Sequence, residues 1–477
     1  MTPRKPKPAT KHPKSPPAGK PNRAPSQPAP LKPAAPQLAE IKQVEIEKPV
    51  YGGAFLARLD GKAIFVPLTL PGEQASIRIV EDRRGYATAE AERIVTIAPQ
   101  RVAPQCSHYG VCGGCHYQHA NYASQLAFKQ TILRETLLRA GVPPPGEIQI
   151  LAAPQPHQAW AYRNRIRLAF NPAGNPGYRG RRSHAIVPIV QSSIPQSSIL
   201  DCPIAAPLLL SAAQAFADVL RQAAPALRPS ELSLFCNSSE TAMLASLSAA
   251  GVPHKFRFDQ LAKAVNDRIP ALKGAELLAE TRVDAPPQTI ARWGATSLTY
   301  HAAKFDYRVD HGAFFQINRW LVDSLVDTVT AGQAGSLAWD LFAGVGLFAR
   351  RLTSSFSRVI AVESAPPAVS ALEENLRDTS GSAVRATTFD FLRSAPKDPP
   401  PDLIVVDPPR TGLGPEITAL LVRIAAPTLV YVSCDPATLA RDLHALGAGG
   451  YEIETVTLAD LFPQTFHLET VVRLHRS

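Results

Sequence analysis

The sequence predicts a multidomain α/β protein whose C-terminal part is a doubly wound, Rossmann-like domain. Three observations indicate this fold class: apolar runs typical of buried parallel strands, a glycine loop between one such run and a helix, and short N-terminal strands separated by turn signals. The chain has 477 residues, enough for roughly two to four domains.

Residues 1–40 form a basic tail rich in proline and lysine, which we expect to be disordered. Residues 1–39 hold eight Lys or Arg and no acid, whereas the rest of the chain holds 42 basic and 40 acidic residues. The net charge of +10 therefore describes mainly the tail. The tail fits either a solubilising extension or an arm that seeks phosphates.

Composition also constrains the compartment. The start of the chain lacks an apolar segment, and no stretch approaches the roughly 18 apolar residues that span a bilayer. Six cysteines in so long a chain do not form a disulfide framework. We therefore expect a cytoplasmic monomer without a membrane partner.

Residues 41–98 predict a small β-barrel of the oligonucleotide-binding type. Residues 41–46 alternate in polarity, and Gly52-Gly53 and Asp60-Gly61 are turn signals between short apolar runs. The pattern favours an RNA-binding barrel, and a structural β-domain without a ligand is the alternative.

Residues 99–305 predict a middle domain in which strands and helices alternate. The helical part near 124–156 is expected to pack on the C-terminal domain. Arg163, Arg165 and Arg167 fall on one face of a predicted strand, and a second arginine group follows at 179–182. We predict that Arg163 and Arg165 contact RNA phosphates; a solvated surface is the alternative.

Three cysteines of the middle domain lie in one short loop, Cys106, Cys112 and Cys115, with two glycines between the last two. A fourth thiol is available from Cys202, which precedes a proline. Four thiolates suit a [4Fe–4S] cluster or, as alternatives, a structural zinc or no metal at all.

Residues 306–477 predict the doubly wound domain, with strands near 337–340, 358–363, 403–407 and 428–433. Gly344 and Gly346 lie between the first strand and a helix, and Glu363 ends the next strand, where it could accept hydrogen bonds from a ribose. An acid precedes the glycines and a third glycine is missing, which favours S-adenosylmethionine over a dinucleotide. A tight βα turn without a ligand is the alternative.

Cys434 follows an apolar run, so it is expected at the carboxyl end of a buried strand, where open α/β sheets build their sites. Asp407 ends another such run before two prolines, and Glu469 lies farther along the chain. A thiol and two carboxylates on strand ends suggest covalent catalysis with proton transfer. The alternatives are a buried structural thiol and, for Asp407, a helix N-cap.

Together these motifs resemble the RNA 5-methyluridine methyltransferase family, which methylates carbon 5 of uridine in ribosomal or transfer RNA. The resemblance runs from about residue 42 to the end, and it departs from the family pattern at Ala343, Leu347, Gln464 and Phe466. It implies a TRAM barrel, an iron–sulfur loop and an S-adenosylmethionine-dependent domain. The cofactor contacts that it implies, together with the glycine loop, are Gln316, Phe342, Gly344, Gly346, Glu363, Asp390 and Asp407.

The resemblance also implies the chemistry. Cys434 is the expected nucleophile toward carbon 6 of the uracil, Glu469 the general base at carbon 5, and Asp407 the group that holds the polar edge of the ring. The expected substrate is 23S rRNA, with transfer RNA as the alternative. A non-catalytic RNA-binding or ribosome-assembly factor, a radical S-adenosylmethionine enzyme and a cytosine-directed methyltransferase are the rivals.

Overall fold

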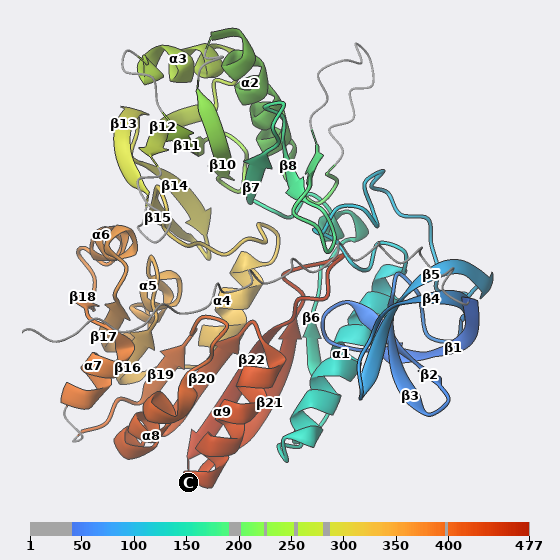
Figure 1. Ribbon diagram of the computed structural model, residues 1–477. Helices are drawn as coiled ribbons and strands as arrows, with labels where there is room; N and C mark the ends of the chain where they lie inside the picture. Colours follow the sequence, from blue (N-terminus) through green and yellow to red (C-terminus); the bar gives the residue numbers. More distant parts are fainter. Residues whose placement is uncertain are drawn as a thin grey trace, which may run out of the picture. The chain divides into compact units, whose positions relative to one another are not determined.

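The computed structural model describes residues 41–189, 202–223, 227–251, 256–279, 287–395 and 399–476 (Figure 1). These residues form a five-stranded barrel, a seven-stranded sheet with two helices, a two-stranded hairpin and an eight-stranded sheet flanked by helices.

The barrel consists of β1 (Ile41–Pro49), β2 (Ala54–Leu59), β3 (Lys62–Pro67), β4 (Gln74–Asp82) and β5 (Tyr86–Thr96), closed in the order β1-β2-β3-β5-β4. Alternate residues point inward, so Val44, Ile46, Phe55 and Ile77 fill the core. Asp60 and Gly61 both have positive φ, which is the geometry of a two-residue hairpin turn between β2 and β3. The predicted barrel is confirmed.

The segment after the barrel contributes to the C-terminal sheet. Helix α1 (Tyr122–Arg139) begins where Asn121 caps the amide of Ser124, and it contacts both β1 and α9 (Pro436–Ala448). Strand β6 (Gln149–Leu151) then pairs in parallel with β21 (Tyr451–Ala459) at the edge of the eight-stranded sheet. A short 3-10 helix, η1 (Pro156–Ala159), leads to the middle of the chain.

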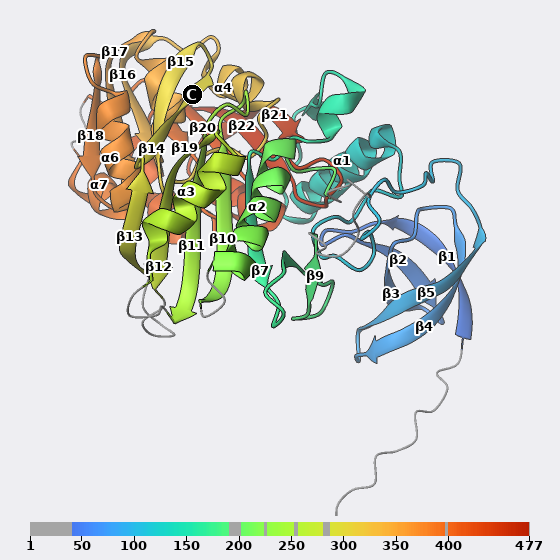
Figure 2. The same cartoon turned by 90° about the horizontal axis from the view of Figure 1, so that it is seen from above.

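The seven-stranded sheet has the order β13-β12-β11-β10-β7-β8-β9. Helices α2 (Pro207–Ala223) and α3 (Phe258–Arg268) pack together on one of its faces, as Figure 2 shows. The strands are β7 (Arg165–Phe170), β8 (Pro176–Arg179), β9 (Ile186–Pro188), β10 (Arg228–Cys236), β11 (Met243–Gly251), β12 (Leu272–Ala279) and β13 (Gln288–Gly294). The hairpin β14 (Ser297–Ala302) and β15 (Phe305–Asp310) packs instead into the core of the C-terminal part.

The eight-stranded sheet has the order β18-β17-β16-β19-β20-β22-β21-β6. The first five strands are parallel, and β22 is antiparallel to both of its neighbours. Its remaining strands are β16 (Gly335–Leu341), β17 (Phe356–Glu363), β18 (Gly381–Arg385), β19 (Leu403–Val406), β20 (Thr428–Ser433) and β22 (Glu469–Arg476). The strand order reverses between β16 and β19, which is where such folds bind their ligands.

Both faces of this sheet are buried, which explains why its strands are continuous apolar runs. Along β19 and β20, Val405 and Val430 face one core, and Ile404 and Leu429 face the other. The first core includes residues of α4 (Val322–Thr330), α5 (Leu347–Leu352) and α6 (Pro366–Asn375). The second includes residues of α1, α7 (Thr388–Ser394), α8 (Gly414–Ile424) and α9. The Rossmann-like prediction is confirmed.

Among the described residues, no helix is long and apolar enough to cross a membrane.

Candidate active site

The fold brings Cys434, Asp407 and Glu469 together at one edge of the eight-stranded sheet. Asp407 directly follows β19, Cys434 directly follows β20, and Glu469 is the first residue of β22. Strand β20 lies between β19 and β22, and Ser433 of β20 is opposite Thr470 of β22. Three segments that together span 62 positions of sequence, from Asp407 to Glu469, thus place a thiol and two carboxylates at the carboxyl end of β20.

Burial sets the protonation of this cluster. Burial, followed by the charges of Glu469 and Asp407, raises the pKa of Cys434 to about 11. Burial raises the pKa of Asp407 to about 7, and burial together with Asp407 raises that of Glu469 well above its usual value. The thiol is therefore protonated at neutral pH, and its ionisation is opposed by the carboxylates that surround it.

Arg410 is the cation of the site. Its charge lowers the pKa of both Cys434 and Glu469, although burial outweighs it in each case. Its Nη2 lies 3.1 Å from Nδ1 of His467. A guanidinium can only donate, so Nδ1 accepts and the ring proton of His467 sits on Nε2. Burial, followed by the charge of Arg410, lowers the pKa of His467 to about 3 and keeps this ring neutral.

The loop that carries Cys434 is fixed on its other side by a helix cap. Oδ1 of Asp435 accepts the backbone N–H groups of Ala437 and Thr438, both at 3.0 Å, which starts α9. Oδ2 of Asp435 accepts the hydroxyl of Tyr51 from the barrel at 3.2 Å. The barrel therefore contacts the residue next to the thiol, a relationship that no local sequence signal indicates.

A cavity lies beside Asp407, and several residues of the predicted cofactor site line it. Gln316, Phe342, Gly344 and Asp407 all line it. Nε2 of Gln316 approaches Oδ2 of Asp407 at 3.5 Å, so this glutamine joins the cavity to the thiol cluster. The sequence interpretation missed Phe314, whose side chain is 61% exposed and lines the same cavity.

The glycine loop between β16 and α5 is shaped by three residues with positive φ: Phe342 at 64°, Gly344 at 57° and Gly346 at 88°. A phenylalanine in this region is strained, and such strain is typical of ligand-binding loops. Asp340, near the end of β16, bonds to the helix that follows the loop. It is fully buried and accepts the N–H of Ala349 at 2.8 Å, and burial raises its pKa to about 8.

Three other predicted cofactor residues do not line this cavity. Gly346 caps α5, and an added Cβ would lie 2.6 Å from Leu372. Glu363 ends β17 and accepts three backbone N–H groups, those of Gly344, Ser364 and Ala365, at 2.7–3.0 Å. Asp390 accepts the hydroxyl of Thr387 at 2.7 Å at the start of α7. In this structure the carboxylates of Glu363 and Asp390 therefore bond to nearby groups of the protein itself.

The four predicted metal-binding cysteines, Cys106, Cys112, Cys115 and Cys202, line one cavity together with Arg163 and Tyr178. Burial is the first cause of a raised pKa at Cys112, Cys115 and Cys202, and Arg163 opposes it at each. Among the described residues, no group of three or more His, Cys, Asp or Glu side chains is placed so that it could hold a metal ion. Cys236 is buried elsewhere, in the core of the seven-stranded sheet.

Arg163 and Arg165, predicted to contact RNA, are occupied within the protein. Arg163 lines the cysteine cavity, and its Nε lies 3.4 Å from the hydroxyl of Tyr162. Arg165 stacks on the ring of Phe235 and donates to the carbonyl of Ala313 at 2.8 Å. Burial lowers the pKa of Arg165 to about 10. Neither guanidinium lies on an open surface.

Known proteins resemble this chain in both sequence and fold. Residues 398–477, which hold Asp407, Cys434 and Glu469, match the family model described as tRNA (Uracil-5-)-methyltransferase, and residues 38–91 match the TRAM domain. A tRNA (uracil-54, C5)-methyltransferase of Pyrococcus abyssi, solved with S-adenosyl-L-homocysteine, shares the fold with a TM-score of 0.72. It is 22% identical, and the match covers 91% of this chain and all of that one.

Two curated relatives are similar over almost their whole length. An uncharacterized RNA methyltransferase of Streptomyces avermitilis is 32% identical over 92% of this chain and 98% of its own. The 23S rRNA (uracil(1939)-C(5))-methyltransferase RlmD of Klebsiella pneumoniae is 31% identical over 89% of this chain and 93% of its own. With this identity and coverage, the chain belongs to the RNA (uracil-C5-)-methyltransferase family and is a methyltransferase that acts on RNA.

Proposed function

We propose that this enzyme methylates carbon 5 of one uridine in 23S rRNA, with S-adenosylmethionine as methyl donor and a transient bond between Cys434 and carbon 6 of the uracil. One observation carries the proposal. The carboxyl ends of β19 and β20 and the start of β22 place a thiol near two carboxylates. One of these carboxylates, Asp407, lines the same cavity as Gln316 and Phe342.

Cys434 supplies the nucleophile. Carbon 5 of uracil is too electron-poor to take a methyl group from a sulfonium unaided. A thiolate that adds to carbon 6 converts the ring to an enolate, whose carbon 5 is nucleophilic. The thiol first loses its proton to solvent, and Arg410 is the group that favours this ionisation. S-adenosylmethionine, which residues such as Gln316 and Phe342 would hold, would supply the electrophilic methyl group to carbon 5 and leave as S-adenosylhomocysteine.

Glu469 completes the reaction. After methyl transfer, carbon 5 still carries its original proton, and removing it lets the carbon–sulfur bond break and restores the thiolate and the pyrimidine. Glu469 is 4% exposed, and its raised pKa makes it a stronger base than a surface carboxylate. Asp407, in reach of Gln316, holds the polar edge of the ring.

We propose that the cysteine cavity holds a [4Fe–4S] cluster, on the number and type of its thiols and not on their positions in this structure. Four thiols line it, and the backbone N–H of Gly114 donates to Sγ of Cys112 at 3.4 Å, as amides commonly do to sulfur ligands in such sites. Gly113 has little room for a side chain, because a Cβ there would lie 3.1 Å from the carbonyl oxygen of Arg179. Zinc is the alternative, and iron and acid-labile sulfide in anaerobically purified protein distinguish the two.

The choice of 23S rRNA rests on the named relative, and a tRNA substrate is the second candidate because the matching fold is that of a tRNA enzyme. Methylation of in vitro transcripts of 23S rRNA segments and of tRNA compares them directly. The measured product is 5-methyluridine, located by mass spectrometry of nuclease digests.

A transcript containing 5-fluorouridine tests the covalent mechanism. Fluorine at carbon 5 cannot be removed as a proton, so the adduct accumulates. We expect a protein–RNA species that survives denaturation and depends on the methyl donor. Cys434→Ala should abolish it, whereas Cys236→Ala, a buried cysteine outside the site, should leave it intact. An adduct that persists in Cys434→Ala would refute the assignment.

A further inference from the structure

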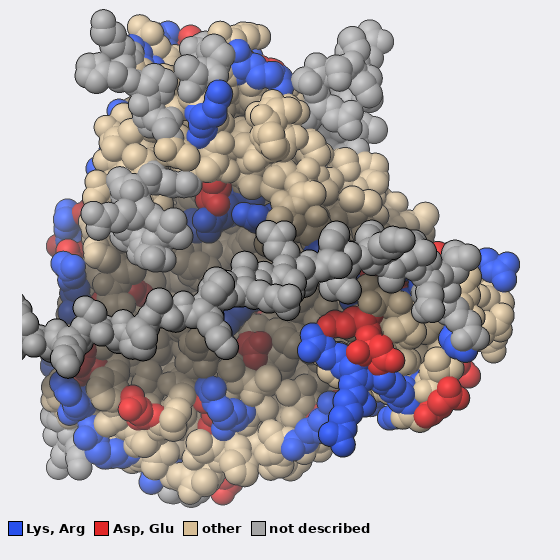
Figure 3. All heavy atoms as spheres, viewed as in Figure 1, with Lys and Arg blue, Asp and Glu red and all other residues tan. Residues whose placement is uncertain are grey.

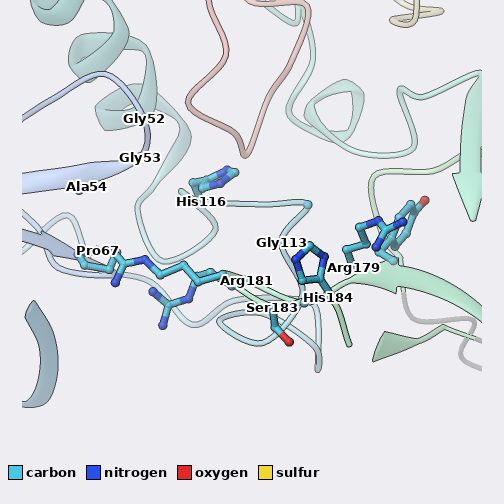
Figure 4. A pocket seen from close by; sticks show the side chains of 14 residues that line it. Gly52, Gly53, Ala54, Pro67, Gly113, His116, Arg179, Arg181, Ser183 and His184 are labelled. Atoms are coloured by element: carbon cyan, nitrogen blue, oxygen red, sulfur yellow. The ribbon is translucent and has the colours of Figure 1, made fainter. Parts of the chain in front are cut away.

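An open groove lies between three segments that are far apart in the sequence (Figure 4). We call it the arginine groove. Its lining comes from the barrel (Gly52–Ala54 and Pro67), from the cysteine loop (Gly113, Gly114 and His116), and from the end of β8 and the residues that follow it (178–184). Its volume of about 680 Å³ lies within the range of ligand sites, roughly 300–1,000 Å³.

The lining of the groove is basic. Arg179, Arg181 and Arg182 line it, and none of its described lining residues is an aspartate or glutamate. Figure 3 shows one face of the molecule, on which basic and acidic side chains are interspersed. Two of the three guanidinium groups, Arg181 and Arg182, share the single carboxylate of Glu90, so the groove keeps a net positive charge, which suits an anion.

Arg181 is held in place yet keeps unused donors. Its Nη2 donates to Glu90 of β5 at 2.8 Å and its Nε to the carbonyl of Gly110 at 3.1 Å. Its Nη1 is buried without a partner among the described residues, as is Nδ1 of His116. Both atoms belong to residues that line the groove, which adds two unpaired polar atoms to its wall.

Glu90 also orders the second arginine, since it accepts Arg182 Nη1 at 3.3 Å. One barrel carboxylate thus fixes two guanidinium groups at the groove. In contrast, Arg179 is exposed and forms no ion pair with another residue that the structure describes. Figure 4 shows His116, Arg181 and His184 around the open space.

The groove begins where the active site ends. The ring of His116 lies 4.6 Å from that of Phe466, which lies 4.3 Å from that of His467, two residues before Glu469. Tyr51, next to Gly52 in the groove wall, contacts both Phe466 and Asp435. A polymer whose base reaches Cys434 can therefore continue past this aromatic cluster into the arginine groove.

We propose that the arginine groove binds the phosphodiester backbone of single-stranded RNA beside the target uridine, with Arg179, Arg181 and Arg182 facing the phosphates. This inference rests on the proposed function, because it identifies the polymer by the uridine it presents to Cys434. Phosphates suit the groove because planar guanidinium groups donate to them in pairs. The open shape suits a chain that passes through rather than a small enclosed ligand.

The test compares Arg179→Gln/Arg182→Gln with Arg139→Gln, which removes an exposed arginine on α1. Arg181 is left intact, since its bonds to Glu90 and Gly110 make it a structural contact as well. RNA affinity is measured against salt concentration. Each lost phosphate contact lowers the slope of log K against log salt by about 0.7 for single strands. We expect a fall of about 1.4 for the double variant and none for the control.

Three further measurements sharpen the result. The double Lys variant, Arg179→Lys/Arg182→Lys, should restore most of the slope, since it keeps the charges. The KM for a long transcript should rise about tenfold in the Gln variant, while the affinity for S-adenosyl-L-homocysteine stays unchanged. An unchanged salt slope in the Gln variant would overturn the inference. Failure of the wild-type enzyme to methylate any RNA would instead overturn the proposed function, and the salt slope remains measurable in that case.

Discussion

The hydroxyl of Tyr51 donates to Oδ2 of Asp435 at 3.2 Å, across 384 positions of sequence. Asp435 is the residue after Cys434 and the cap of α9, so this bond links the barrel to the loop of the proposed nucleophile. The ring of Tyr51 also packs edge-on against Phe466, 5.4 Å away. The barrel therefore contacts, through Tyr51, both the residue after Cys434 and the aromatic residue three positions before Glu469.

Tyr51→Phe removes this bond and keeps the ring contact with Phe466. We expect a loss of stability of about 1 kcal/mol, as for an ordinary hydrogen bond. We also expect a fall in kcat/KM, since the loop of Cys434 loses one of its two anchors. Thermal unfolding and methylation assays measure the two effects. Tyr86→Phe, on the same barrel but away from the site, is the control and should change neither.

The raised pKa of Cys434 predicts a pH profile. With a value of about 11, the thiolate fraction grows about tenfold with each pH unit below it. Glu469 also gains its basic form as pH rises, because its pKa is raised as well. We therefore expect kcat/KM to increase with pH through the neutral range. Arg410→Gln should shift the profile to higher pH, because it removes the cation that lowers the pKa of Cys434. A flat profile would contradict this account.

Glu469→Gln separates the two roles of this carboxylate. Turnover should be lost, because the proton on carbon 5 is not removed. The reactivity of Cys434 should nevertheless increase, since the charge of Glu469 raises the pKa of this thiol and glutamine carries none. The measurement is the rate of alkylation of the Cys434 peptide, followed by mass spectrometry at fixed pH. Glu452→Gln, an exposed residue of β21, should leave that rate unchanged.

The sequence was sufficient to predict the elements with a strong local signature. Buried parallel strands such as β19 and β20 are continuous apolar runs, and their carboxyl ends carry Asp407 and Cys434. The turn at Asp60-Gly61 likewise marks a hairpin of the barrel by residue type alone. These features depend on neighbours in the chain, which is why they could be predicted.

Other features depend on contacts that the sequence does not display. Strand β6 has only three residues, and its pairing with β21 spans about three hundred positions. Alternation placed Arg163 and Arg165 on one strand face, but what covers that face is set by Phe235, Ala313 and the cysteine cavity. The bond between Tyr51 and Asp435 has no local signal for the same reason.

A buried ion pair supports the segment that leads to Glu469. Lys129 of α1 and Asp460 are both fully buried; Lys129 also donates to the carbonyl of Phe462 at 2.9 Å, and Asp460 accepts the hydroxyl of Tyr122 at 2.8 Å. Burial lowers the pKa of Lys129, and Asp460 opposes that effect. The pair therefore anchors the segment after β21 to α1.

Lys129→Met leaves the carboxylate of Asp460 buried and unpaired, which typically costs about 3–5 kcal/mol. We expect a large fall in the melting temperature, and a smaller one in Lys129→Met/Asp460→Asn, where no lone charge remains. Differential scanning fluorimetry measures both. Lys263→Met breaks an exposed pair with Asp267 and should have no measurable effect. Equal losses in the single and double variants would show that the charge is not the cause.

Loss of the proposed [4Fe–4S] cluster should weaken RNA binding through the arginine groove, because Gly114 and Tyr178 line both the cysteine cavity and that groove. We expect Cys115→Ser to lose iron and sulfide and to bind RNA with a smaller salt slope, while its affinity for S-adenosyl-L-homocysteine is kept, since the cavity of Gln316 and Phe342 shares no lining residue with the groove. Cys236→Ala is the matched control and should retain both iron and slope. If Cys115→Ser loses the metal but binds RNA as the wild type does, the two sites are independent.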